Sequence, residues 1–155
     1  MIQRIQSFYL FLTTLLSLLF LKGSFLNFVD KTGSVIKVTF NGIVRDTGGQ
    51  GFELIEKLLP ISAFIIFIPV FSLVTIFIFK NRKIQLWLAS SEIILVVGFI
   101  FVSIFYSWFI ITEYGAEIVP GFKMVIPLLM LVFAVLAYRG IRKDDRLIKS
   151  NDRLR

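Results

Sequence analysis

The sequence contains no cysteine and no histidine, and both absences exclude large classes of chemistry. Without cysteine the chain forms neither disulfides nor thiolate metal sites, and it has no thiol nucleophile. Without histidine it lacks the commonest general base and the commonest transition-metal ligand. The sequence also has no glycine-rich phosphate loop and no nucleophile elbow. We therefore predict that the protein is not an enzyme and uses no metal or cofactor.

Charge is also scarce. Charged residues make up 17% of the 155 residues, whereas 57% are hydrophobic and 18 are Phe. The mean hydropathy of +0.86 is far above that of a soluble domain, in which about a quarter of residues are charged. Four apolar segments are read as membrane spans, at residues 5–21, 58–79, 84–112 and 122–140. We expect the first to be a retained anchor rather than a cleaved signal, and Pro69 to kink the second.

The first loop, residues 22–57, is the only segment outside these spans with room for a fold of its own. Its stretch SVIKVTFNGIVRD alternates apolar and polar residues around Asn41-Gly42, which predicts a β-hairpin over residues 34–46. The following FELIEKLL has an apolar face at helical spacing and predicts a short interfacial helix. The predicted fold class is thus an all-α membrane protein, a single domain with four transmembrane helices and a small extracytoplasmic β-hairpin.

The spacing of Trp87 and Trp108 along the third span can be compared with the thickness of a membrane. They are 21 positions apart, which corresponds to roughly 31 Å along a helix and matches the hydrocarbon thickness of a bilayer. We interpret them as the two interfacial belts. Lys and Arg concentrate in the loop at 80–83 and after Arg139, so the positive-inside rule predicts cytoplasmic N- and C-termini. The net charge of +7 is then located at the cytoplasmic face of the membrane rather than spread over a soluble fold. We therefore expect no nucleic-acid partner.

Glu92 is an acid within an apolar span, and an intramembrane ionisable residue is by default a functional-site hypothesis. It lies five residues past Trp87, roughly 7–8 Å below the cytoplasmic interface. Polar stripes on the first and third helices indicate contacts between helices. The intramembrane polar set comprises Glu92, Arg4, Gln3, Gln6 and Gln85. Partners considered for Glu92 are Arg4, the amides of Gln3 and Gln6, Arg139, Arg142 or another subunit.

The tail after Tyr138 carries dense charge of both signs, and three interpretations stay open. It is a solvated end that satisfies the positive-inside rule, a site for anionic lipid headgroups, or a docking segment for a partner protein. The candidate docking residues are Arg139, Arg142, Lys143, Asp144, Asp145, Arg146, Asp152, Arg153 and Arg155.

The two ends of the chain, MIQRIQSFYLFL and AYRGIRKDDRLIKSNDRLR, carry a family resemblance. They resemble a Bacteroidota family of small four-helix integral membrane proteins of unknown function. The resemblance implies a bacterial inner-membrane location and four spans, and no activity. The matching residues are Ile2, Gln3, Arg4, Ile5 and Gln6, then Arg139, Lys143, Asp144, Asp145, Leu147, Asp152, Arg153 and Arg155.

Three hypotheses for function follow, of which a membrane enzyme is the least favoured because the chain lacks the usual acid–base and nucleophile sets. The first is a non-enzymatic accessory or structural subunit of an inner-membrane complex, such as a machine for protein export or insertion. Its partners are the bilayer, a larger membrane complex and anionic lipid headgroups. The alternative is a small carrier or lipid-binding protein that uses Glu92.

Overall fold

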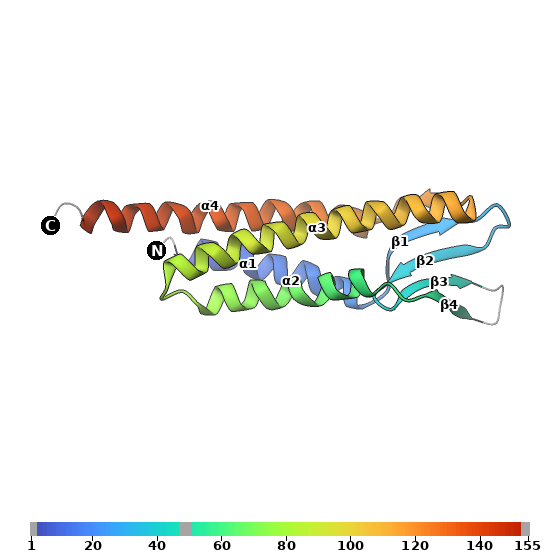
Figure 1. Cartoon of the computed structure of the whole chain (residues 1–155), viewed down its shortest axis with the longest axis horizontal. Coiled ribbons are helices and arrows are strands. Elements are labelled where there is room, and N and C mark those ends of the chain that lie inside the picture. The colour runs from blue at the N-terminus through green and yellow to red at the C-terminus, as the bar shows by residue number, and fades with distance from the viewer. Residues whose placement is uncertain (1–2, 47–50, 153–155) are drawn as a thin grey trace.

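A bundle of four helices forms the long part of the molecule in the computed structural model, which describes residues 3–46 and 51–152 (Figure 1). The helices are α1 (Gln3–Leu18), α2 (Leu59–Phe77), α3 (Arg82–Tyr114) and α4 (Ile126–Asp152), with short 3-10 helices η1 (Leu19–Leu21) and η2 (Phe122–Val125). α1 begins and α4 ends at the same end of the molecule, which we call the terminal end (Figure 1). The β-sheet lies at the opposite end, which we call the sheet end.

Three helices are long and apolar enough to cross a membrane: Leu59–Phe77, Arg82–Tyr114 and the segment Phe122–Leu147. The first helix is apolar but shorter, spanning Ile5–Leu21. The structure thus describes a protein with membrane-spanning helices. The predicted count of four transmembrane helices is wrong by this criterion, because three of the described helices meet it.

The sheet has five antiparallel strands in the order β4-β3-β2-β1-β5. They are β1 (Ser24–Val29), β2 (Val35–Thr39), β3 (Gly42–Asp46), β4 (Phe52–Glu56) and β5 (Glu117–Val119). The predicted fold of an all-α protein with one small hairpin is therefore wrong. The turn at Asn41-Gly42 is present between β2 and β3, but this pair is the middle of a larger sheet.

Two further segments differ from their sequence-based predictions. Phe52–Glu56 is strand β4, not an interfacial helix, because its backbone pairs with β3. Glu117–Val119, in the loop expected only to turn at Pro120-Gly121, pairs with β1 as β5. β4 pairs with the preceding strand and β5 with a strand distant in sequence, and local periodicity reveals neither pairing.

Gly42 shows why the middle of the sheet needs glycine. Its φ is +140°, a region that favours glycine, and a Cβ there would lie 2.0 Å from the backbone oxygen of Glu56. The strand that leads into α2 therefore passes directly against the hairpin turn. A hydrogen bond of 2.6 Å from Ser62 Oγ to the backbone oxygen of Phe40 fixes the same junction.

The sheet is continuous with the bundle core rather than a separate appendage. Phe28, Ile36 and Ile43 on the sheet are fully buried, and they belong to the same apolar cluster as residues of α2, α3 and α4. At the junction, the Phe20 ring lies 5.6 Å from that of Phe25 and 5.5 Å from that of Phe99, as measured between centroids. Aromatic packing thus joins η1, β1 and α3 and fixes the sheet to the helices.

Candidate functional site

A chain of polar contacts at the terminal end links all four helices. Gln6 Nε2 of α1 donates a 2.7 Å hydrogen bond to Asp144 Oδ2 of α4. The same carboxylate oxygen lies 3.7 Å from Arg82 Nη1 of α3. Arg82 also donates to Gln85 Oε1 at 3.3 Å, and Gln85 Nε2 donates to the backbone oxygen of Thr75 on α2 at 3.2 Å. We call Gln6, Asp144, Arg82, Gln85 and Thr75 the terminal network.

Four of the five members of this network are buried, and the Arg82 side chain is 13% exposed. Gln6 and Gln85 are each 2% exposed, and Asp144 is 8% exposed. A buried polar group without a partner destabilises the folded state, whereas a satisfied network fixes the relative position of the elements that carry it. The network therefore sets the register of the four helices at this end.

The rotation of α4 follows from a buried stripe along one face. Ala134, Ala137, Ile141 and Asp144 recur at intervals of three and four residues, and all are buried. Gly140 lies beside this stripe, where a Cβ would come within 2.7 Å of Gln6 Cγ. Small residues thus let α1 and α4 approach closely, and Asp144 extends the packed face with a carboxylate.

Glu92 lies deeper in the bundle than the terminal network and is not part of it. It is fully buried on α3, seven residues beyond Gln85, and thus roughly 10 Å from the level of the network. Ser72 of α2 lies close enough to interact with the Glu92 carboxyl group, but the Ser72 hydroxyl donates its hydrogen bond to the backbone oxygen of Leu10 at 2.7 Å. Both carboxylate oxygens of Glu92 lack a hydrogen-bond partner among the described residues.

The structure separates residues that the sequence grouped with Glu92. Gln6 and Gln85 bond within the terminal network, and Arg139 and Arg142 are exposed. Gln3 and Arg4 belong to α1, but their side chains lie outside the described residues, so the expected pairing with Arg4 stays a prediction. Trp87 and Trp108 project from α3 with 67% and 63% of their surface exposed.

The candidate docking residues divide into two groups. Asp144 faces the bundle, whereas Arg139, Arg142, Lys143 and Arg146 are exposed on α4. Asp145 is half-buried and makes a contact of its own. Asp152 is the last residue of α4 and its side chain is not described, and Arg153 and Arg155 lie outside the described residues.

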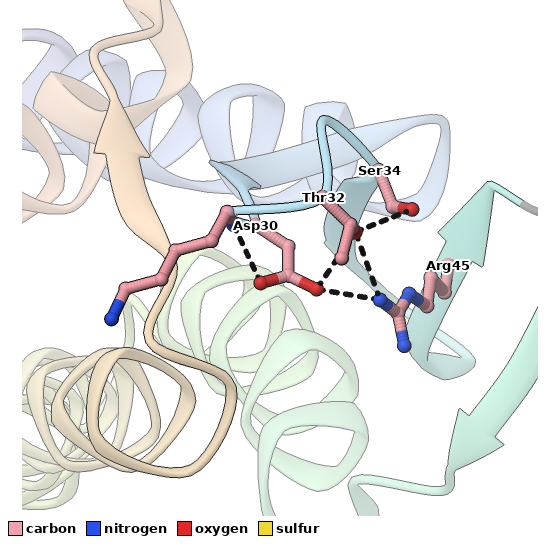
Figure 2. Close-up of polar contacts among 5 residues, drawn as sticks. Asp30, Thr32, Ser34 and Arg45 are labelled. Carbon is pink, nitrogen blue, oxygen red and sulfur yellow. Dashed lines mark hydrogen bonds and ion pairs between the residues drawn. The ribbon is translucent and has the colours of Figure 1, made fainter.

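A second polar cluster ties the outer turn of the sheet together. Arg45 of β3 donates to Asp30 Oδ2 at 2.5 Å, and Thr32 Oγ1 donates to the same oxygen at 3.1 Å (Figure 2). Thr32 and Ser34 hydroxyls lie 3.1 Å apart within the turn. Every strong acceptor here is used by the sheet itself, so we assign this cluster to holding the β1–β2 turn against β3.

Lys123 caps the sheet end of the helical segment formed by α1 and η1. Its amino group donates to the backbone oxygens of Leu19, at 3.2 Å, and of Lys22. A cation against the last carbonyls of a helix satisfies groups that have no intrahelical partner. It also lies at the rim of an apolar groove between α3 and α4 that includes Ile104, Met124 and Leu128.

Sequence reasoning missed Arg82, Thr75 and Ser72, and it placed Asp144 with the docking residues. The spacing of Ala134, Ala137, Ile141 and Asp144 is the signal that would have placed Asp144 against the bundle. Within residues whose side chains are described, no three potential metal ligands cluster.

These observations define a class: a helical bundle with membrane-spanning helices, fixed to an antiparallel sheet at one end and a polar network at the other. A family model for a domain of unknown function, DUF4293, matches residues 2–154. The chain therefore belongs to this uncharacterised family. No curated protein and no solved structure matches it.

Proposed function

We propose that the protein is a non-enzymatic accessory subunit of a bacterial inner-membrane complex, with protein export or insertion as a candidate process. The observation that carries the proposal is the open edge of the sheet at β4. All five β4 residues are exposed, including Phe52 at 53%, Leu54 at 45% and Ile55 at 41%. An edge strand with apolar side chains is a template for pairing with another chain.

The occupant that fits this edge is an extended segment of a different protein. Among the described strands β4 is the terminal one and pairs on one side only, with β3, so its outer side offers backbone donors and acceptors. Exposed apolar side chains beside that edge would be covered by the added strand. The carboxylates of Glu53 and Glu56 are exposed as well, which favours a segment that carries lysine or arginine.

A second copy of the chain is a poor fit to this edge. Two copies with the same orientation in one membrane are related by an axis along the membrane normal. The strands run roughly along the long axis of the bundle (Figure 1), so a two-fold axis in that direction would set identical β4 residues at equal height. In a parallel pair, however, the hydrogen bonds are slanted, so each residue bonds to residues above and below its own level on the neighbouring strand. The symmetry therefore disfavours a dimer through β4.

The proposed orientation puts the terminal end in the cytoplasm and the sheet outside. It rests on the positive-inside rule, because Lys80, Arg82, Lys83 and the basic residues of α4 lie at the terminal end. The bacterial inner membrane and a Bacteroidota source follow from the family resemblance of the two chain ends. In this arrangement β4 meets extracytoplasmic segments of its partner.

The test is native purification of the tagged chain with quantitative mass spectrometry. We expect a complex of constant stoichiometry, and we expect Leu54→Lys to dissociate it, because lysine protects edge strands from pairing. Val29→Lys is the matched control, since Val29 is 36% exposed on interior strand β1. Recovery of a lone monomer, or a complex that tolerates Leu54→Lys, would contradict the proposal.

A carrier or lipid-handling protein is the second candidate, and it is favoured because neither carboxylate oxygen of buried Glu92 has a hydrogen-bond partner among the described residues. A buried carboxylate without a partner reduces stability and is often retained for function. Proteoliposomes that transport a solute or exchange lipid, and lose that activity with Glu92→Gln while still folding, would favour this candidate over the first.

A further inference from the structure

Four cations form one stripe on the exposed side of α4. Arg142, Lys143 and Arg146 lie three, four and seven positions after Arg139, which puts all four on one helix face, and with Leu147 they line a surface concavity of about 480 Å³. All four are exposed, and none has an ion pair with another described residue. We call these four residues the basic stripe.

The direction of the basic stripe is fixed by the other side of the helix. Ile141 is fully buried, and Asp144 is bonded to Gln6, so this face of α4 is held against the bundle. The stripe must therefore point outward, away from the other helices. Asp145 is the one described carboxylate at its flank, which leaves four cations against one acid on this surface.

The height of the stripe along the molecule follows from the Asp144–Arg82 ion pair. Arg139 lies five positions before Asp144 on α4, and Trp87 lies five positions after Arg82 on the antiparallel α3. Arg139 is thus level with the exposed indole of Trp87, a side chain typical of the membrane interface. Arg146 lies roughly 10 Å further toward the terminal end. The stripe therefore begins at the level of the membrane interface and extends through one headgroup layer and slightly beyond it.

The surface below the stripe is suited to acyl chains. Val132 and Leu128 lie seven and eleven positions before Arg139, on the same face of α4, and are 52% and 56% exposed. An apolar track therefore leads up the helix into the cations. This continuity matches a lipid, whose tails lie along the track while its phosphate meets the guanidinium groups, better than it matches a water-soluble partner.

We propose that the basic stripe of α4 binds the phosphate of anionic glycerophospholipids, with their acyl chains along Leu128 and Val132. Arginine binds phosphate oxygens through two parallel hydrogen bonds, and three of the four residues are arginines. The site is independent of the β4 edge and of the process that the complex serves. In this proposal α4 is the helix that retains anionic lipid at the surface of the protein.

The test uses the full chain in nanodiscs and in detergent titrated with dioleoyl phosphatidylglycerol or dioleoyl phosphatidylcholine. Native mass spectrometry counts retained lipids, and thermal unfolding gives the shift in Tm. We expect phosphatidylglycerol to be retained and to raise Tm more than phosphatidylcholine does. Arg142→Gln/Arg146→Gln should weaken its apparent affinity by roughly tenfold to thirtyfold.

Lys80→Gln/Lys83→Gln is the matched control, because it removes the same charge from exposed residues at the same end of the molecule. It should leave the affinity within about threefold of the wild-type value, since exposed charges elsewhere contribute weakly. Both variants should keep the wild-type Tm in phosphatidylcholine, which shows that they fold.

Several outcomes would overturn the proposal. Equal losses in both variants would show a diffuse charge effect rather than a site, and equal retention of both lipids would remove the specificity for anionic lipid. A Tm shift reproduced by inorganic phosphate alone would assign the stripe to a free anion. Unchanged lipid binding together with loss of a co-purifying protein would assign it to protein docking.

Discussion

At the scale of single residues, Glu92 is the side chain whose environment least suits its chemistry. Glu92→Met replaces the carboxylate with an apolar side chain of similar length that fills irregular space. Because neither carboxylate oxygen has a partner among the described residues, we expect the free energy of unfolding to rise by about 1–3 kcal/mol. Reversible denaturation in detergent micelles measures the change.

Glu113→Met is the control, since Glu113 is exposed near the sheet end of the same helix. Its effect should stay within about 0.5 kcal/mol. A large loss of stability in Glu92→Met would show instead that Glu92 has a stabilising partner, such as Arg4 or another subunit. If the variant is more stable but inactive, Glu92 is retained for function.

At the scale of elements, the terminal network makes the packing of four helices depend on one carboxylate. Asp144→Ala leaves Gln6 without its hydrogen-bond acceptor and Arg82 without its ion-pair partner in a nearly buried site. We expect a loss of about 2–4 kcal/mol in the free energy of unfolding, most of it the cost of unpaired polar groups. Thermal and chemical unfolding in detergent measure it.

Asp145→Ala is the neighbouring control, and we expect it to cost clearly less because Asp145 is half-buried and outside the network. A double-mutant cycle of Gln6→Ala with Asp144→Ala should show a coupling of about 1–2 kcal/mol. Additive effects would mean that the 2.7 Å contact contributes little to holding α1 against α4.

The elements themselves differ in how far the sequence predicts them. The long helices follow from apolar runs alone, because each run exceeds what a soluble domain would bury. The β2–β3 turn follows from Asn41-Gly42, whose backbone requirement is local. β4 does not, since Phe52–Glu56 fits both the helical and the strand period and only pairing with β3 decides between them. Three-residue β5 carries no local signal at all.

The candidate site was predictable to a similar degree. The sequence identifies Gln6, Gln85 and Glu92 as polar residues within apolar helices, which is a local property. It does not say which residues meet. Asp144 lies in a segment dense in charge, so composition suggests a solvated tail, whereas the helix rotation set by Ala134, Ala137 and Ile141 turns it inward. Such contacts depend on how α1 and α4 cross.

At the scale of the whole molecule, the two ends are built for different surroundings. The sheet end shares one apolar core with the helices and exposes β4, while the terminal end combines a buried network with an outward basic stripe. Because the sheet and the helices share this core, we expect that a partner bound at β4 would also fix the height of α4 in the bilayer. The side of the membrane that each end faces therefore decides which partner and which leaflet each one meets.

That orientation can be measured cleanly, because the chain has no cysteine and every introduced thiol is unique. Thr32→Cys probes the exposed outer turn of the sheet, and Lys83→Cys probes the exposed start of α3. In cells with a permeabilised outer membrane, we expect a membrane-impermeant maleimide to label Thr32→Cys at once. Lys83→Cys should react only after the inner membrane is lysed, because basic loops are retained in the cytoplasm. The opposite pattern would place the basic stripe in the outer leaflet and β4 in the cytoplasm, and the proposed partners of both would have to be exchanged.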